Sequence, residues 1–464
     1  MDTYPRAKRL TEVAAVVDLT PLASGDPRYV DISEGRGTDG LKKLRLCLHD
    51  HDAEANRFAK IAFTGHRGCG KSTELLRLEH EVEKRFTSLH VFAEEALLED
   101  YDYTDLFLWL VDELVRQFQA RDIPLNPKLV DAVAEWFAEV TLEQKDEVES
   151  KIALETEAEL QAKWGVFGNS LKLLARLKSM VVGSTARRKT IRQTLQKNSE
   201  QLIGQINLLL GNAQSVLKES GRPEDLLIVV DNLDRLPPDV SETLFFRNGD
   251  LLKRLKAHVI YTVPIATVLA PTRIGTVFEK SFTLPMVKVR SPQGKPYKPG
   301  LDALIQVVAG RIVLDAVFPD RRVVRRLAEM SGGNVRDLMR LVYNAQLSAR
   351  VDDKERIDTD AAKRAVLDMR LDYERLLNPA QTYFPLLARI HKTKGDGSEV
   401  DHEASPERVE GYRAFFRDFL FNGSVLEYNG DSMWYDVHPI VQEIERFQEA
   451  VKHVESQEDI PEAG

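Results

Sequence analysis

The sequence is poor in cysteine, with Cys47 and Cys69 as its two cysteines among 464 residues. Two cysteines cannot build the disulfide framework of a small secreted domain, and they cannot form a cysteine-based zinc site. Cys69 also lies inside the glycine-rich motif described below. We therefore expect a protein of the reducing cytoplasm.

Long apolar runs are also missing. No stretch approaches the length needed to cross a bilayer, and the first residues, Met1 to Arg6, contain no hydrophobic leader segment. These absences predict a chain that is neither exported nor inserted into a membrane.

Positive charge is not in excess, because the formal net charge is −9. An acidic total argues against a protein that coats nucleic acid by bulk attraction, so DNA binding would need a local basic patch. With 43% hydrophobic and 30% charged residues, the composition is that of a globular chain long enough for two to four domains.

One run matches the phosphate-binding pattern G-x-x-x-x-G-K-[ST] at every fixed position: Gly65-His66-Arg67-Gly68-Cys69-Gly70-Lys71-Ser72. The apolar residues 58–64 before it predict a buried strand, and a helix is expected to continue from Thr73. Strand, loop and helix therefore follow in the order that a P-loop requires. We take residues 65–73 as the predicted phosphate-binding set.

The residue types in this motif suit a triphosphate. The anion needs main-chain N–H donors at close range, and Gly65, Gly68 and Gly70 allow the chain to curl around it. Lys71 is expected to reach the β- and γ-phosphates, and Ser72 to place its hydroxyl on Mg²⁺. The helix that follows points its positive dipole end at the anion.

A second anchor is the apolar run at 226–231, which ends in Asp231. An uninterrupted apolar run of this length is typical of a central parallel strand that is buried on both faces. Asp231 is expected to hold the Mg²⁺ water shell opposite Ser72, as a Walker B aspartate does.

Other candidate site residues carry two interpretations each. Thr262, near the end of a predicted strand at 258–263, either senses the γ-phosphate or is an ordinary strand-end threonine. Tyr29 and Val30 either contact the nucleotide base or belong to the core. Arg336 follows a glycine turn that opens a helix, from which its side chain could swing over the nucleotide.

The predicted strands alternate with helices, which implies a parallel sheet. The strands are expected at residues 58–64, 89–93, 226–231, 258–263 and 282–289, and helices at 103–118 and 242–255. The predicted fold class is α/β: a P-loop NTPase core with a parallel sheet and a long helical insertion, a helical lid and a C-terminal winged-helix-like domain.

We predict four regions along the chain. They are an N-terminal lead-in at 1–57, the ATPase core at 58–300 with a helical insertion at 126–218, a helical lid at 301–375, and a winged-helix-like module at 376–464.

The insertion contains basic amphipathic runs at 171–178 and 186–192. These runs indicate either a solvated helix face or a contact with nucleic acid or a membrane surface. The acidic stretch at 143–159 favours charge pairing within the insertion.

In the last region, a helix at 408–421 precedes two short strands around Asn429-Gly430-Asp431, which is a hairpin signal. Helices followed by a hairpin suggest a winged helix. Because acidic residues alternate with Arg408, Arg413 and Arg417 on this helix, a protein partner is favoured over DNA.

Taken together, the P-loop with Asp231, the loop Asp231-Asn232-Leu233-Asp234-Arg235, the lid segment Gly332–Asp337 and the terminal hairpin module resemble AAA+ and STAND-type ATPases. The order is most similar to the KAP-like and origin-recognition-like branches. The resemblance covers roughly residues 20–375, and the C-terminal module more loosely.

The resemblance implies ATP as the nucleotide, Mg²⁺ as the metal, Thr262 as a γ-phosphate sensor and Arg336 as the arginine of the lid. Families of this kind are nucleotide-driven switches that form homo-oligomers and act on a partner. An arginine acting on a neighbouring subunit's nucleotide is also implied, with Arg247, Arg254 and Arg273 as candidates.

One position departs from the family pattern. These ATPases generally place a second acid directly after the Walker B aspartate, where it activates the attacking water, and this chain has Asn232 there. An amide cannot accept that proton. Asp234 is the candidate substitute, and without it hydrolysis would be slow. The membrane helices of many KAP proteins are also missing from the sequence.

The sequence thus predicts an ATP-binding and hydrolysing switch of the AAA+/STAND type that oligomerises and regulates a partner effector, in a process such as bacterial antiphage defence. The alternative is a DNA-binding ATPase of the origin-recognition or transposition-regulator kind. A third interpretation, a nucleotide-bound scaffold without meaningful hydrolysis, follows from Asn232.

Overall fold

The computed structural model describes residues 5–50, 57–141, 167–269, 277–377, 383–397, 406–429 and 432–458. The chain divides into two compact units. The first, here called the P-loop unit, comprises Met1–Lys42, Thr64–Arg77 and Thr283–Gly464. The second, here called the sheet unit, comprises Lys43–Phe63 and Leu78–Phe282.

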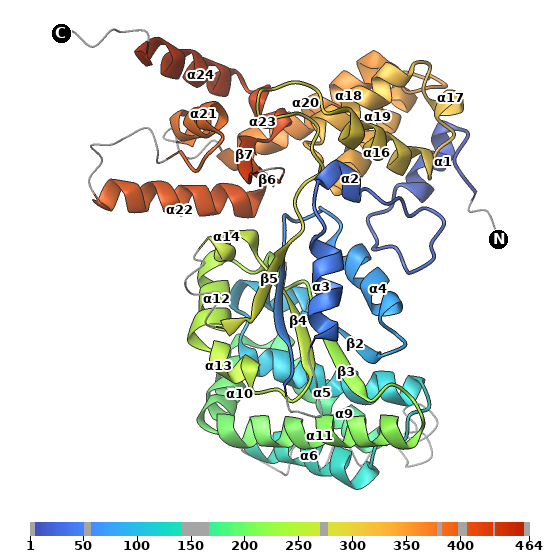
Figure 1. Ribbon diagram of the computed structural model, residues 1–464, viewed down its shortest axis with the longest axis vertical. Coiled ribbons are helices and arrows are strands. Elements are labelled where there is room, and N and C mark those ends of the chain that lie inside the picture. Colours follow the sequence, from blue (N-terminus) through green and yellow to red (C-terminus); the bar gives the residue numbers. More distant parts are fainter. Residues whose placement is uncertain are drawn as a thin grey trace. The chain divides into compact units, whose positions relative to one another are not determined.

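All five strands of the larger sheet lie before residue 284, with one or more helices between successive strands (Figure 1). In chain order they are α1 (Leu10–Val16), α2 (Ser33–Arg36), α3 (Gly40–His49), β1 (Lys60–Thr64), α4 (Lys71–Glu81), β2 (Phe86–Phe92), η1 (Glu95–Asp100), α5 (Tyr103–Ala120), α6 (Pro127–Thr141), α9 (Gly168–Gly183), α10 (Thr185–Lys197), α11 (Ser199–Glu219), β3 (Asp225–Asp231), η3 (Leu233–Arg235), α12 (Pro238–Glu242), η4 (Thr243–Arg247), α13 (Gly249–Lys253), β4 (His258–Val263), α14 (Ile265–Val268) and β5 (Lys280–Thr283).

The second half is mainly helical. It contains α16 (Lys298–Ala309), α17 (Leu314–Val317), α18 (Arg321–Met330), α19 (Val335–Val351), α20 (Thr359–Leu377), α21 (Tyr383–Thr393), α22 (Pro406–Asn422), β6 (Val425–Tyr428), β7 (Trp434–Val437), α23 (Pro439–Gln442) and α24 (Glu445–Glu458). Within the described residues, no helix is both long enough and apolar enough to span a membrane.

The five-stranded sheet has the order β2-β3-β4-β1-β5. Strands β2 and β3 pair in parallel, as do β3 and β4. Strands β1 and β5 also run in the same direction. The Glu279 N–H donates to Lys60 O at the start of β1, and the Leu284 N–H donates to Thr64 O at its end. The predicted α/β fold with a parallel sheet is confirmed.

Strand β3 lies inside the sheet, between β2 and β4. From Leu226 to Asp231 every residue is buried, which explains why the sequence there shows no polar alternation. Helix α5 packs on β2 and carries the longest run of buried side chains in the cluster around the sheet. The burial of these apolar residues is the main force that holds the sheet together.

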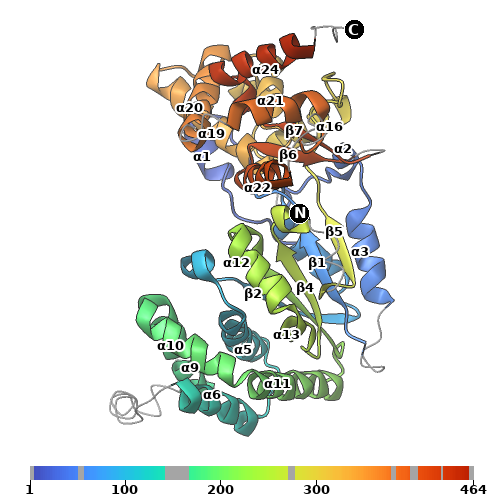
Figure 2. The same ribbon diagram turned by 90° about the vertical axis from the view of Figure 1, so that its left-hand side faces the viewer.

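The described part of the predicted insertion is helical. Helices α6, α9, α10 and α11 gather into one group, as Figure 2 shows, and α6 packs against α9, α10 and α11. The acidic stretch expected to pair with the basic runs, residues 143–159, lies outside the described residues.

The basic runs pair instead with acids of η1 and α5. Lys178 Nζ lies 2.7 Å from a carboxylate oxygen of Asp112, which is fully buried and also accepts from Arg116. Arg192 contacts Asp105 at 2.5 Å. Burial raises the pKa of Asp105 to about 6, although its hydrogen bond with Arg192 acts in the opposite direction. These pairs fix the helical group to α5.

Two predicted elements end differently in the structure. The strand expected at 282–289 is wrong in its bounds, since β5 covers Lys280–Thr283, before Pro285, which has no N–H to continue the ladder. The helix expected at 242–255 is interrupted after the wide turn η4. Residue 249 has to be a glycine, because a Cβ atom there would lie 2.7 Å from the side chain of Val277.

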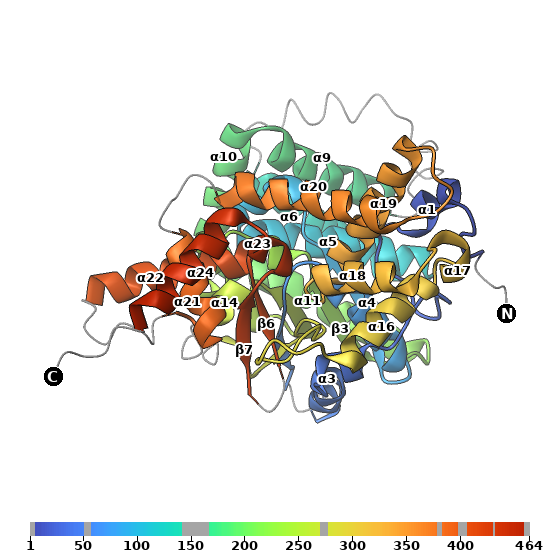
Figure 3. The same cartoon turned by 90° about the horizontal axis from the view of Figure 1, so that it is seen from above.

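In the P-loop unit, helices α16 to α20 enclose a separate apolar core, to which α1 and Ile440 also contribute. Strands β6 and β7 form an antiparallel hairpin, with Val425 opposite Val437 and Tyr428 opposite Trp434. Figure 3 shows the two strands side by side. The predicted hairpin is thus confirmed, while the winged-helix interpretation and the four predicted regions stay predictions.

The buried carboxylate of Asp112 gives a test of how the helical group is held. Replacing it with alanine leaves Lys178 and Arg116 without their acceptor in a largely dry environment. We expect Asp112→Ala to lower the free energy of unfolding by about 3 kcal/mol, measured by urea denaturation. Glu219→Ala, at an exposed helix end, is the control and should change it little. Equal midpoints for the two variants would contradict the account.

Candidate nucleotide-binding site

The P-loop joins the end of β1 to the start of α4. Gly68 has φ 87° and Gly70 has φ 100°, conformations that side chains with a Cβ rarely adopt. Lys71 and Ser72 then form the first turn of α4. A glycine-rich loop that leads from a strand into the N-terminus of a helix is the arrangement that binds phosphate.

The ammonium group of Lys71 lies inside this loop. Its Nζ donates to Gly65 O and His66 O, each at 2.8 Å, and the residue is 4% exposed. The charge is thus held by the loop's own carbonyl oxygens, at the place where a phosphate chain is expected.

Glycine is also required because other parts of the P-loop unit pack closely on the loop. A Cβ at Gly68 would lie 2.5 Å from Asn334 Oδ1 and 2.8 Å from Arg336 Cβ. A Cβ at Gly65 would lie 2.5 Å from Leu284 O. All three distances are too short for a real contact, so any larger residue would displace these neighbours.

The N-terminus of α19 is bonded to the P-loop main chain. The N–H of Arg336 donates to Gly68 O at 3.2 Å. Asn334 caps the helix by accepting from the N–H groups of Arg336 and Asp337, and its Nδ2 donates to Arg67 O at 3.0 Å. The predicted lid arginine therefore begins a helix that lies directly on the loop.

His66 links the loop to the hairpin. Its Nε2 accepts the Glu427 N–H of β6 at 2.7 Å. Burial and the neighbouring charge of Lys71 lower the pKa of His66 to about 3, so the ring is neutral and Nε2 can accept. The Glu427 carbonyl in turn accepts from the Met286 N–H at 3.2 Å.

Sequence reasoning missed Arg36, which lies 2% exposed at the end of α2. Its Nη2 donates to Cys69 O at 2.6 Å, while Nε and Nη1 have no hydrogen-bond partner within the described residues. The sequence shows only an arginine between two glycines, and nothing in that pattern indicates a contact with the P-loop.

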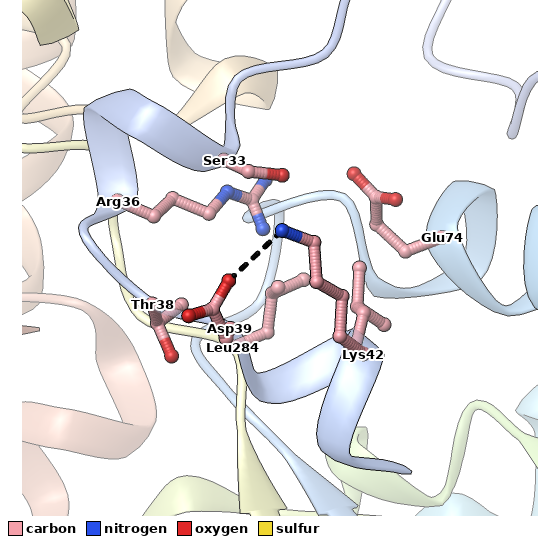
Figure 4. Close-up of a pocket in the computed structure, with 8 residues that line it drawn as sticks. Ser33, Arg36, Thr38, Asp39, Lys42, Glu74 and Leu284 are labelled. Carbon is pink, nitrogen blue, oxygen red and sulfur yellow. Dashed lines mark ion pairs between the residues drawn. The ribbon is translucent and has the colours of Figure 1, made fainter. Parts of the chain in front are cut away.

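Arg36 lines an open pocket. Figure 4 shows its guanidinium group beside Ser33, with Glu74 across the pocket and Lys42 paired with Asp39 at 3.1 Å. Buried donors without acceptors are costly, so this pocket suits a ligand that offers oxygen acceptors.

The lead-in residues contact α4 and the lid core. Tyr29 is half-buried, with its hydroxyl near Glu74 at 3.3 Å and its ring under Arg77 at 4.7 Å. Val30 packs on the core around α16 to α20. Thr73 Oγ1 accepts from the Leu22 N–H at 3.1 Å. The choice between base contact and core packing stays open for Tyr29 and Val30.

In the sheet unit, Asp231 is 1% exposed at the end of β3. Its Oδ1 accepts from the Asn232 N–H at 2.7 Å, and its Oδ2 lies 3.7 Å from His90 Nε2. His90 Nδ1 lies 2.6 Å from Glu79 Oε1.

Burial alone would lower the pKa of His90, but the nearby Asp231 carboxylate and the hydrogen bond with Glu79 raise that pKa to about 9. The protonated ring thus compensates the buried charge of Asp231. Sequence reasoning did not predict this histidine, because its role depends on which strands are neighbours in the sheet.

The remaining predicted residues have different surroundings. Thr262 is fully buried, and its hydroxyl donates to Val230 O at 3.2 Å, which ties β4 to β3. Asp234 lies in the short turn η3, after Asn232, whose φ of 70° reverses the chain. Arg254 pairs with Glu200, and Arg273 lies outside the described residues.

The basic side chains that could favour DNA are partly engaged within the protein. On α22, Arg417 and Arg413 lie 3.8 and 4.0 Å from Glu410. On α10, Arg188 lies 3.3 Å from Asp100. Within the described residues no group of three or more His, Cys, Asp or Glu side chains could hold a metal ion.

The packing at Gly68 can be tested without a nucleotide. Gly68→Ala places a Cβ against Asn334 and Arg336 at a positive φ, so we expect the free energy of unfolding to fall by roughly 1–3 kcal/mol. The control is Gly183→Ala, where no atom lies within 4 Å of the added Cβ. Thermal unfolding followed by circular dichroism measures both. A Gly68→Ala protein as stable as the control would contradict the close packing.

Among solved structures, similar chains include Cdc6p from Pyrobaculum aerophilum at 13% identity, covering 94% of this chain and 97% of that chain, with a TM-score of 0.38. The Aeropyrum pernix ORC2 protein, in its ADPNP-ADP complexes, shows 11% identity, coverages of 95% and 98%, and a TM-score of 0.43. A Walker-type ATPase of Pyrococcus abyssi shows 13% identity, coverages of 92% and 98%, and a TM-score of 0.44.

These scores are too low for the likenesses to bear on activity, and no curated protein matches the chain significantly. The family comparison is more specific. Residues 52–260, just under half of the chain, match the model of the KAP family P-loop domain. This range includes the P-loop, β3 with Asp231, and the first half of β4. Residues 52–260 are therefore a P-loop nucleotide-binding domain of the KAP kind, and the chain is a P-loop NTPase.

Proposed function

We propose that this protein is an ATP-dependent molecular switch: it binds ATP with Mg²⁺, hydrolyses it slowly, and changes the contacts of its lid helices and hairpin with the state of the nucleotide. The observation that carries the proposal is a set of hydrogen bonds at the P-loop: its main chain bonds to Asn334 and Arg336, and the side chain of His66 bonds to the Glu427 N–H.

The position of the predicted residues in the sheet supports nucleotide binding. Both the P-loop, after β1, and Asp231, at the end of β3, follow the carboxyl ends of strands in one sheet, with β4 between them. Ligands of open α/β sheets bind at this edge. In the proposal, Lys71 binds the phosphates, Ser72 and Asp231 serve Mg²⁺, and the residues 65–73 cradle the anion.

The hydrogen bonds at the loop suggest how binding would be transmitted. The carbonyl oxygens of Gly65 and His66 now hold Lys71, and a triphosphate would compete for that ammonium group. A shift of the loop would change the acceptors offered to Asn334 Nδ2 and the Arg336 N–H. The lid and the hairpin would then respond to the same event.

Slow hydrolysis follows from Asn232 at the position of the usual second acid, so that another carboxylate has to act as the base, either Asp234 of the same loop or one from a neighbouring strand. In the proposal, Thr262 would sense the γ-phosphate, and Arg336 would contact the nucleotide from the lid. Arg36, which donates to Cys69 O, would bind oxygen acceptors of the ligand in its pocket. We further propose that the protein forms homo-oligomers and regulates an effector protein, with antiphage defence as the process that the family resemblance favours.

DNA binding is the second candidate, favoured by the exposed Arg187 and Lys189 of α10. It is placed second because neighbouring basic residues pair within the protein. Duplex DNA that stimulates ATP turnover, with a stimulation that fades between 50 and 200 mM salt, would reverse this order.

Substitution of Lys71 and Asp231 tests the nucleotide site. Lys71→Ala should lower ATP affinity at least 100-fold, because the phosphates lose their buried cation. Asp231→Ala should retain ATP binding but lose Mg²⁺-dependent turnover. Binding is measured with a fluorescent ATP analogue and turnover by phosphate release. The exposed Lys84→Ala is the matched control and should behave as the unmodified protein. Unchanged turnover in either site variant would refute the assignment.

A further inference from the structure

The chain that follows β2 leaves the sheet beside Asp231. In the parallel pairing of β2 with β3, Phe92 lies opposite Asp231. The ladder continues for one more bond, since the Ala93 N–H donates to Asp231 O at 3.0 Å. The residues directly after Ala93 therefore start from the position of the Walker B aspartate.

The alternation of side chains places Glu94 on the same face as Asp231. Paired residues of neighbouring strands point to one side of a sheet, and so do residues two apart on one strand. His90, two residues before Phe92, confirms the face, because its ring lies 3.7 Å from the Asp231 carboxylate. Glu94, two residues after Phe92, keeps an extended backbone with φ −69° and ψ 119°. Its side chain thus lies one step beyond Asp231, toward the carboxyl edge.

The side chain of Glu94 forms no ion pair in the part of the chain that the structure describes, although it lies close enough to Tyr101 to act with burial and Asp105 in raising the pKa of that phenol. Glu94 is half-buried, and its carboxylate forms no hydrogen bond or ion pair with the described residues. The next residue, Glu95, differs in both respects, because it is exposed and pairs with Arg235 of the exit loop. Glu94 is therefore the carboxylate that remains available beside Asp231.

The exit loop itself offers no acid next to Asp231. Asn232 has an amide that cannot accept a proton, and its φ of 70° turns the chain away from the line of β3 before Asp234 is reached. A strand neighbouring β3 can supply the missing carboxylate instead, since the carboxyl ends of parallel strands meet at one edge.

We propose that Glu94 is the general base of ATP hydrolysis in this protein. This inference rests on the proposed ATP hydrolysis. In the step, the oxygen of a water molecule forms a bond to the γ-phosphorus while the bond from that phosphorus to the bridging oxygen of ADP breaks. The water's proton passes to the Glu94 carboxylate, and the bond's electron pair leaves with ADP, so atoms and charge balance without a further reactant.

The test compares Glu94→Gln with Asp234→Asn and with Glu95→Gln as the matched control, all in the full chain. Phosphate release at saturating ATP and Mg²⁺ gives kcat, and a fluorescent ATP analogue gives the Kd. We expect Glu94→Gln to lower kcat at least 100-fold while the Kd changes less than threefold, because a general base contributes to the reaction rather than to binding. Glu94→Asp should restore part of the rate, and Glu95→Gln should keep kcat within threefold.

A kcat within threefold of the unmodified protein for Glu94→Gln would overturn the inference and leave the proposed function intact, most clearly if Asp234→Asn abolished turnover. If the Glu94→Gln variant unfolds at the same temperature as the unmodified protein, misfolding is excluded as the cause of a lower kcat. An unmodified protein that binds ATP but releases no phosphate would overturn both the proposed hydrolysis and this inference.

Discussion

The main chain of the P-loop is bonded to residues that lie far away in the sequence, and the rest of the P-loop unit depends on these bonds. Arg36 donates to Cys69 O, Asn334 to Arg67 O, and the Arg336 N–H to Gly68 O. Such contacts require a loop whose carbonyl oxygens remain accessible. The glycines of the loop are therefore needed for this packing as well as for the expected phosphate binding. The same glycines therefore serve both the packing of the lid helix and the expected ligand.

Electrostatics imposes the corresponding constraint in the sheet unit. A carboxylate as buried as Asp231 is costly without a partner, and His90 supplies the opposing charge between Asp231 and Glu79. Because side chains alternate between the two faces of the sheet, Glu94 lies on the same face as His90 and Asp231. The pairing of β2 with β3 thus decides which side chains surround the aspartate, and the sequence around Asp231 alone does not.

Sequence reasoning predicted the features that depend on local pattern. The strand ending in Asp231, the P-loop between strand and helix, and the hairpin were correct because apolar runs, glycines and turn residues report on neighbours in the chain. It missed Arg36 and His90, whose contacts depend on chain crossings and strand order. It also misplaced the last strand, because an apolar run does not show where Pro285 ends the ladder.

The most direct test of the account is an isothermal titration of the purified protein with ATP, carried out once with Mg²⁺ and once with excess EDTA. The account predicts saturable binding at one nucleotide per chain, with clearly tighter binding in Mg²⁺, because the proposal has the nucleotide bind together with the metal. Absence of binding in both conditions, or binding of equal strength with and without Mg²⁺, would contradict it.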